Sequence, residues 1–238
     1  MNPFMALYLK ELKGNRLVSA VMLVATGAIV LVVVSDASDG GMHATMSLLM
    51  LPYLSPPLLA GLLMHSISQE WSGDTQHQWL ALPVPHSMLP LAKLAAVSTL
   101  ALGVFVLNTL GLHMILDQTM AALGESIRSP GLEHINIEAG DVWSMIGGLF
   151  GSMTALLLGL ALAAASFRML VPRFKGLVTV SVFLGGFWLT GRLADTVGEA
   201  LRGGAAVAEA HQAYLFLAGM GVLFAAMGAY LFEKHVDA

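Results

Sequence analysis

The sequence has no cysteine and few charged residues. The absence of cysteine excludes a disulfide framework and a thiolate metal site, and it leaves the redox compartment open. Charged residues make up 11% of the 238 positions and hydrophobic residues 57%, whereas soluble domains carry about 25% charged residues. A soluble domain of this length cannot use so much apolar surface, because it must also cover itself with polar groups. We therefore expect a polytopic membrane protein.

Other absences narrow the function. The net charge of −4 and the lack of a basic stripe argue against a nucleic-acid partner. No GxxxxGK[ST] phosphate loop and no HExxH motif occur, so the chain cannot bind ATP or zinc through these motifs. Ion-coupled transporters hold ionisable groups near the middle of the bilayer, and the apolar segments here are almost free of them. If the protein moves a solute uphill, the energy enters from outside the bilayer.

Six apolar segments approach or exceed the length of about 20 residues that crosses a bilayer as a helix. They lie near 17–34, 46–67, 91–116, 142–165, 176–194 and 213–232. Pro52, Pro56 and Pro57 interrupt the second segment, and we expect them to bend its helix. No linker or change in composition divides the chain. We predict one all-α integral membrane domain over 1–238, with six spans.

The first 16 residues, "MNPFMALYLKELKGNR", have the pattern of an amphipathic helix. On a helix, four residues share one face: Phe4, Leu7, Tyr8 and Leu12. Three basic residues gather near its end: Lys10, Lys13 and Arg16. This pattern predicts an interfacial helix over 1–16, along the membrane before the first span. A cleavable signal peptide is the alternative, since residues 35–37 loosely resemble a cleavage site, but the preceding segments are too long for one.

The basic residues predict the orientation, because cytoplasmic loops carry an excess of Lys and Arg. With the amino terminus inside, the cytoplasmic side receives Lys10, Lys13, Arg16, Lys93, Arg168, Arg173, Lys175 and Lys234. The outer side receives only Arg128, Arg192 and Arg202. An even number of spans then places both termini in the cytoplasm.

Small residues recur every four positions on two segments. The fourth segment carries Gly147, Gly151, Ala155, Gly159 and Ala163, and the sixth carries Gly221, Ala225 and Ala229. Small residues let membrane helices approach closely. We expect them to pack helices within the chain, and a subunit interface is the alternative.

Residues that would indicate an enzyme are few. Gly151-Ser152 only faintly resembles a buried serine nucleophile, and no histidine stands at an obvious partner position. An intramembrane enzyme of this kind would lose its activity in Ser152→Ala. His113 and Asp117 are four residues apart and share a helix face. We expect an interfacial hydrogen bond there, with a proton or metal site as the alternative.

The segment "SGDTQHQWLALPVPHSML", residues 72–89, connects the second and third spans. Thr75 and Gln78 fit a capping box at a helix start. The helix must end near Leu82, because the residue before Pro83 is biased away from the α region. A helix of roughly two turns is too short to cross the membrane. A partner that pushes this short helix would move the second and third spans together.

The residues from Glu70 to Lys93, "EWSGDT…LALPVPHSMLPLAK", resemble the signature of ABC-2-type transporter permeases. In that family a Glu, a Gly and a Thr precede a Leu-rich turn, a Leu-Pro-Val stretch and an Ala-Lys pair. The amino-terminal "LYLKELKGNR" resembles the elbow helix that opens such permeases. With the six spans, the resemblance covers the whole chain, but only the 70–90 loop is specific.

The resemblance implies that this loop is a coupling helix that docks into a separate ABC ATP-binding subunit. The implied contact residues are Glu70, Gly73, Thr75, Trp79, Leu82, Pro83 and His86. His86 stands where the family usually has a basic residue, which weakens a charge contact with the ATPase. ATP and Mg would bind to the partner subunit, with no cofactor, metal or catalytic residue on this chain.

The resemblance further implies a permease subunit in a bacterial or archaeal cytoplasmic membrane. Two copies, or one copy and a similar permease, would export a peptide, a lipid or another amphipathic compound without chemistry on this chain. The alternative is a six-span channel or scaffold that works without an ATPase. A polar stripe along one span would favour a channel, and the sequence has none.

Overall fold

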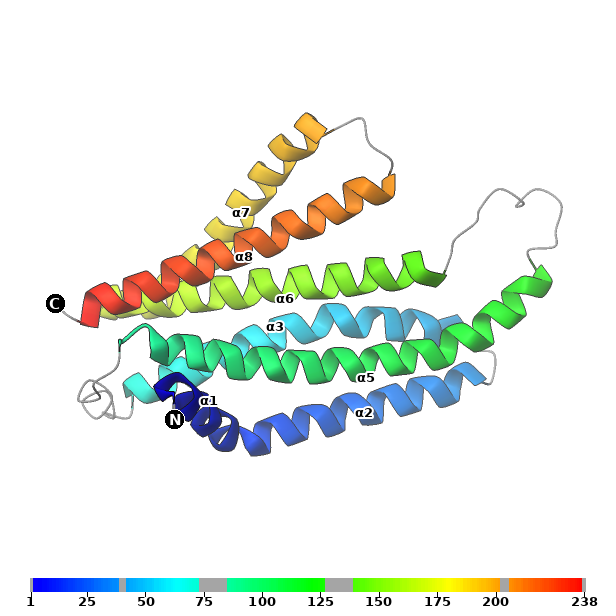
Figure 1. The fold of residues 1–238 in the computed structure, drawn as a ribbon, viewed down its shortest axis with the longest axis horizontal. Helices are drawn as coiled ribbons and strands as arrows, with labels where there is room; N and C mark the ends of the chain where they lie inside the picture. Colours follow the sequence, from blue (N-terminus) through cyan, green and yellow to red (C-terminus); the bar gives the residue numbers. More distant parts are fainter. Residues whose placement is uncertain (1, 39–41, 73–84, 127–138, 202–205, 237–238) are drawn as a thin grey trace.

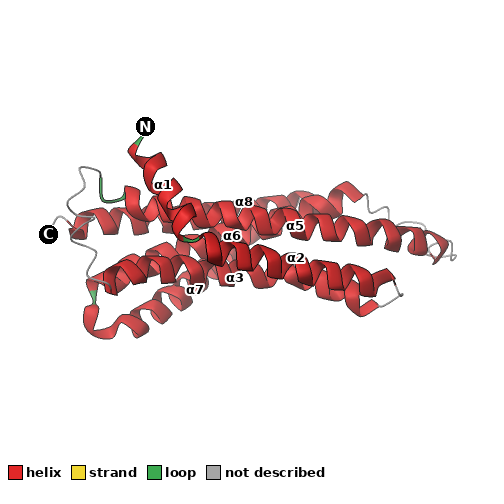
Figure 2. Ribbon diagram, turned by 90° about the horizontal axis from the view of Figure 1, so that it is seen from below, coloured by secondary structure: helices red, strands yellow, loops and turns green. Residues whose placement is uncertain are grey.

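The computed structural model describes residues 2–38, 42–72, 85–126, 139–201 and 206–236. Within this part the chain is all-helical, without a strand (Figure 2). In chain order the elements are α1 (Pro3–Gly14), α2 (Arg16–Ser38), α3 (Met42–Ser72), α5 (Met88–Ser126), α6 (Ala139–Leu170), the short 3-10 helix η1 (Pro172–Phe174), α7 (Lys175–Leu201) and α8 (Ala206–Val236).

Each of the six predicted apolar segments lies inside one helix from α2 to α8. The helices extend past the segments, most clearly at α5, which was expected over 91–116 and covers Met88–Ser126. A helix can propagate through polar residues because each added residue adds a backbone hydrogen bond. Hydropathy therefore finds the apolar part of a helix and misses its ends.

Five helices in the described part of the chain are long and apolar enough to cross a membrane. These segments are Arg16–Ser35, Met88–Met114, Ile146–Leu170, Lys175–Ala194 and His211–Lys234. The chain thus has the helices of a multi-pass membrane protein. The sixth predicted span, 46–67, lies in the 31-residue α3, which is not among these five.

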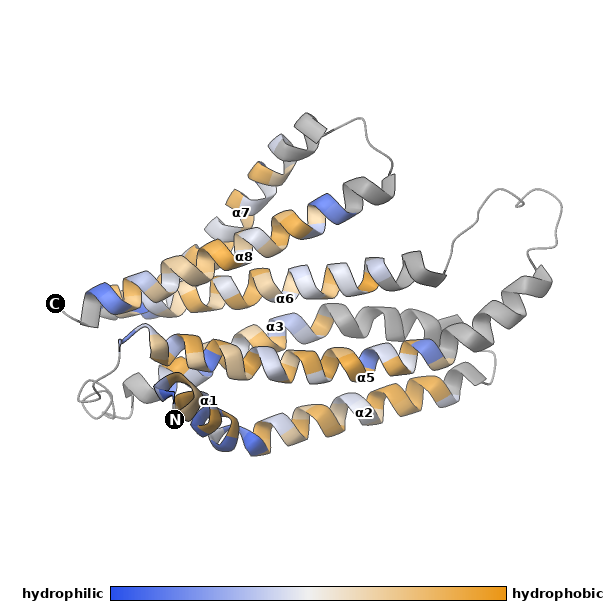
Figure 3. Cartoon of the chain, viewed as in Figure 1, coloured by the Kyte–Doolittle hydropathy of each residue, from blue (hydrophilic) through white to orange (hydrophobic). Residues whose placement is uncertain are grey.

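Helix α6 lies at the centre of the bundle, between α8 on one side and α3 and α5 on the other (Figure 1). One buried core joins α3, α5 and α6 around Leu63, Val104 and Leu162. A second core joins α6 to α8 around Leu160 and Phe224. Helices α2 and α7 are peripheral, and 11% of each span is buried. Both helices consist mainly of apolar residues (Figure 3), many of which are exposed and suit contact with lipid chains.

Helices α6 and α8 touch backbone to backbone. A Cβ atom on Gly159 would overlap the carbonyl of Gly221, and a Cβ atom on Gly221 would overlap the backbone of Ala155. Further along, a Cβ atom on Gly228 would lie 2.9 Å from the backbone nitrogen of Ala163. The predicted packing of small residues within the chain is confirmed for this part of α6.

The first two glycines of the small-residue series on α6, Gly147 and Gly151, do not contact α8. A Cβ atom on Gly147 would meet Phe105 of α5 at 3.5 Å, and one on Gly151 would meet nothing within 4 Å. A step of four residues turns the position by about 40° around a helix with 3.6 residues per turn. Over several steps the series therefore leaves the α8 side and reaches the α5 side.

α3 passes through all three of its prolines without ending, and the bend expected there stays a prediction. α3 is continuous from Met42 to Ser72, through Pro52, Pro56 and Pro57, and the side chain of Pro56 is fully buried. Prolines are tolerated inside membrane helices where neighbouring groups satisfy the carbonyls that they free.

The contact between α6 and α8 predicts unequal effects of two glycine substitutions on α8. Gly221→Ala should lower the free energy of unfolding by about 1–3 kcal/mol, because its methyl group forces the two backbones apart. Gly219→Ala is the matched control, since a Cβ atom there meets nothing within 4 Å, and it should be neutral or stabilising. Thermal unfolding in one detergent measures both. Equal stability of the two variants would contradict the close contact.

Candidate functional site

Most of the predicted coupling loop lies outside the described residues. This holds for Gly73, Thr75, Trp79, Leu82 and Pro83. Glu70 lies in the last turn of α3, and its side chain is also outside the described part. His86 lies in the turn before α5, where it is half-buried and has an interaction partner. The coupling helix therefore stays a prediction, and the structure describes the elements at its two ends.

The loop joins the end of α3 to the start of α5. The start of α5 is built by the Pro-His-Ser sequence: the Met88 N–H donates to the Pro85 carbonyl at 3.0 Å, and the Leu89 N–H to the His86 carbonyl at 3.3 Å. Pro90 is buried in the first turn, where a backbone N–H is not needed. The start of α1 and the end of α8 lie at the same end of the bundle (Figure 1), which we call the loop end.

Helix α1 packs across the first turns of α5. Leu7 is buried with Leu89 and Ala92, and Phe4 packs against them. The Tyr8 hydroxyl lies 2.9 Å from the Thr99 hydroxyl, within hydrogen-bond distance. The apolar face predicted for residues 1–16 thus exists and is turned toward protein. Its place at a membrane interface stays a prediction.

A buried ion pair lies on this face of α1. The Lys93 ammonium of α5 donates to the Glu11 carboxylate at 2.8 Å and to the Ser66 hydroxyl of α3 at 3.1 Å. The side chains of Lys93 and Glu11 are 5% and 10% exposed. We call Glu11, Lys93 and Ser66 the polar cluster. It joins α1, α3 and α5 beside the two ends of the loop.

A second basic side chain reaches the same stretch of α3. Arg168 of α6 donates to the Ser68 hydroxyl at 3.0 Å. The last turns of α3 thus receive a cation from α5 and another from α6. These hydrogen bonds attach the end of α3 to both α5 and α6.

Of the three residues of the polar cluster, the sequence pattern indicates only Lys93, which belongs to the loop motif, and it indicates neither Glu11 nor Ser66. A signal for Glu11 exists: it falls on the apolar face of α1, one turn after Leu7 and Tyr8. A carboxylate on a buried face must have a partner. Its partner is 82 residues away, and the pattern does not identify it.

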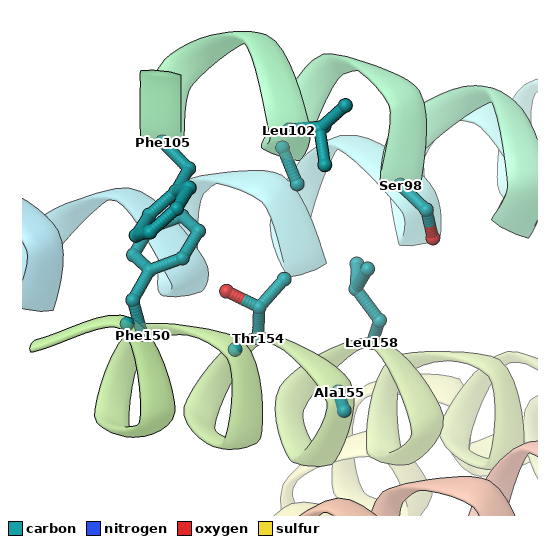
Figure 4. Close-up of a pocket in the computed structure, with 10 residues that line it drawn as sticks. Ser98, Leu102, Phe105, Phe150, Thr154, Ala155 and Leu158 are labelled. Carbon is teal, nitrogen blue, oxygen red and sulfur yellow. The ribbon is translucent and has the colours of Figure 1, made fainter. Parts of the chain in front are cut away.

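A cavity of about 350 Å³ lies between α5 and α6. From α5 it is lined by Ser98, Leu102 and Phe105, and from α6 by Phe150, Gly151 and Thr154, among others (Figure 4). The rings of Phe105 and Phe150 stack with centroids 5.0 Å apart. The lining is apolar apart from the hydroxyls of Ser98 and Thr154. The sequence did not predict this cavity, although its series of small residues supplies part of the space.

The other candidate residues are placed as follows. The buried Ser152 donates its hydroxyl to the Leu149 carbonyl of its own helix at 3.1 Å. His113 is exposed and has a partner, and the side chain of Asp117 lies outside the described part. Within the described ranges, no three His, Cys, Asp or Glu residues gather as metal ligands.

Comparison of the chain with protein-family models, with curated proteins and with solved structures finds no match.

The polar cluster predicts a characteristic pattern of stabilities. Glu11→Gln should lower the free energy of unfolding by about 3–5 kcal/mol, because it leaves the Lys93 ammonium buried without its counter-charge. The double variant Glu11→Met with Lys93→Met should recover most of this loss, since no buried charge remains. Thermal unfolding of the single and double variants measures the coupling.

Glu233→Gln is the control for this experiment, because Glu233 is an exposed carboxylate on α8. Its free energy of unfolding should change by less than about 0.5 kcal/mol. Glu11→Gln and Glu233→Gln of equal stability would show that the ion pair does not hold α1 in place.

Proposed function

We propose that this chain is the transmembrane permease subunit of an ATP-driven exporter of the ABC-2 type. The observation that carries the proposal is the polar cluster, together with the loop sequence that it adjoins. The residues that resemble the family's coupling loop begin in the last turn of α3 and end in the first turns of α5. The cluster joins the last turns of α3 and the first turns of α5 to α1, which is the helix that resembles the elbow of such permeases.

The orientation that we propose places the loop end in the cytoplasm. The start of α1 and the end of α8 share this end of the bundle (Figure 1), as an even number of crossings requires. Lys13, Arg168, Arg173 and Lys175 lie in last or first turns of the helices that terminate there. Their charge agrees with the cytoplasmic excess of basic residues.

The mechanism follows from these connections. Two ATPase subunits close on ATP and displace the loop. The hydrogen bonds of Ser66 and Ser68 carry this displacement from the end of α3 to α5 and α6. The nucleotide thus biases the bundle between inward-open and outward-open arrangements. A second permease, identical or similar, completes the pathway, and this chain carries out no chemistry.

Purification of the chain in mild detergent from its native membrane tests the proposal. We expect a soluble subunit with a Walker A sequence to accompany it in stoichiometric amount. Leu82→Asp should weaken this association at least tenfold, since loss of a central interface anchor costs about 2 kcal/mol. Glu70→Ala should leave the protein inserted but uncouple ATP hydrolysis from transport.

Gly219→Ala is the control for both variants, because it changes an exposed position on α8. It should retain the subunit and the coupling. A chain that purifies alone, and whose thermal stability does not respond to ATP, would contradict the permease function and favour a channel or a scaffold.

A further inference from the structure

We propose that the cavity between α5 and α6 binds a small amphipathic molecule that enters from the membrane. The apolar body of this molecule would lie against the Phe105–Phe150 pair, and one hydrogen-bonding group would pair with the Thr154 hydroxyl. That the bound molecule is the exported cargo rests on the proposed permease function. The binding itself does not depend on that function.

The hydroxyl of Thr154 is the strongest evidence. Thr154 is 7% exposed, and its Oγ1 has no hydrogen-bond partner in the described structure. Four threonines elsewhere bond the carbonyl four residues earlier in their own helices: Thr99, Thr179, Thr190 and Thr196. Thr154 does not use this option, and its hydroxyl lies on the side of the space between α5 and α6 (Figure 4). Buried hydroxyls normally have partners, so a bound molecule that supplies one would be favoured.

The cavity reaches the outer surface of the bundle. Leu102 lines it and is 65% exposed, and Gly151 lines it and is also exposed. Both residues belong to helices that are apolar enough to cross a membrane. The surface around the opening therefore faces lipid chains, and a ligand reaches the cavity through the bilayer.

Size and polarity define the class of ligand. A volume of about 350 Å³ lies at the small end of the range for small-molecule sites, roughly 300–1,000 Å³. The lining has no charged side chain, so a charged group would lose its hydration without compensation. A plain hydrocarbon chain would leave Thr154 unpaired. The remaining class is a neutral, compact molecule with an apolar body and one hydroxyl, carbonyl or amide group.

A diazirine derivative of octanol is a suitable probe, because it joins an eight-carbon body to one hydroxyl. The purified chain is labelled without any ATPase subunit, and the labelled residues are identified by mass spectrometry. We expect saturable labelling of the α5 and α6 residues that line the cavity. Unlabelled octanol should compete, and octane should compete roughly two- to tenfold less well, which is the contribution of one neutral hydrogen bond.

Two pairs of variants make the test specific. Gly151→Phe should fill the cavity and abolish this labelling, and Gly185→Phe on α7 should not, although a Cβ atom meets nothing within 4 Å at either position. Thr154→Val should reduce labelling roughly two- to tenfold. Thr190→Val should leave it unchanged, because Thr190 is equally buried but bonds its own helix.

Three results would overturn the proposal. Labelling that does not saturate and spreads equally over α2 and α7 would show an ordinary lipid-facing surface. Equal labelling of Gly151→Phe and Gly185→Phe would show that the cavity is not the site. Octane that competes as well as octanol would show a hydrocarbon site without a role for Thr154. If the cavity is labelled saturably but the chain captures no ATPase subunit, the permease function alone is refuted. If the chain captures an ATPase subunit but the cavity is not labelled, the ligand site in the cavity alone is refuted.

Discussion

The buried ion pair between Glu11 and Lys93 joins α1 to α5 at the loop end of the bundle. Two charges that have lost most of their water are stable only while each keeps the other. Separation of α1 from α5 would therefore leave the Lys93 ammonium buried without its counter-charge. The hydrogen bond from Lys93 to Ser66 attaches the end of α3 to the same two helices. The polar cluster thus links α1, α3 and α5 beside the connection between α3 and α5.

Packing around α6 is uneven. On one side, Gly159 and Gly221 bring the backbones of α6 and α8 into contact. On the other side, the stacked rings of Phe105 and Phe150 join α5 to α6, and the cavity lies between the two helices beside these rings. Helix α6 is therefore packed closely against α8 and leaves unfilled space beside α5. The cavity on the α5 side of α6 is also where we propose that a ligand from the bilayer binds.

The sequence predicted the helices well because apolar length is a local property. It also predicted the face of α1 and the packing of small residues within the chain, since both follow from helical periodicity, but not which helices the small residues join. The pairing of Glu11 with Lys93 depends on tertiary contacts between distant segments, which no local pattern encodes. The cavity forms where the side chains of α5 and α6 leave space between them, which also depends on tertiary packing. Thr154 could not be recognised from the sequence, because other threonines of the chain bond their own helix and the residue type does not distinguish them.

Hydrogen exchange of the whole chain in detergent, with and without Lys93→Met, tests the central claim most directly. If the polar cluster holds three elements together, the substitution should increase exchange in α1 and in the last turns of α3 as well as at the start of α5. The amides of α8 should keep their protection, because the glycine contact with α6 is intact. An increase confined to α5, with α1 and α3 unchanged, would contradict the account.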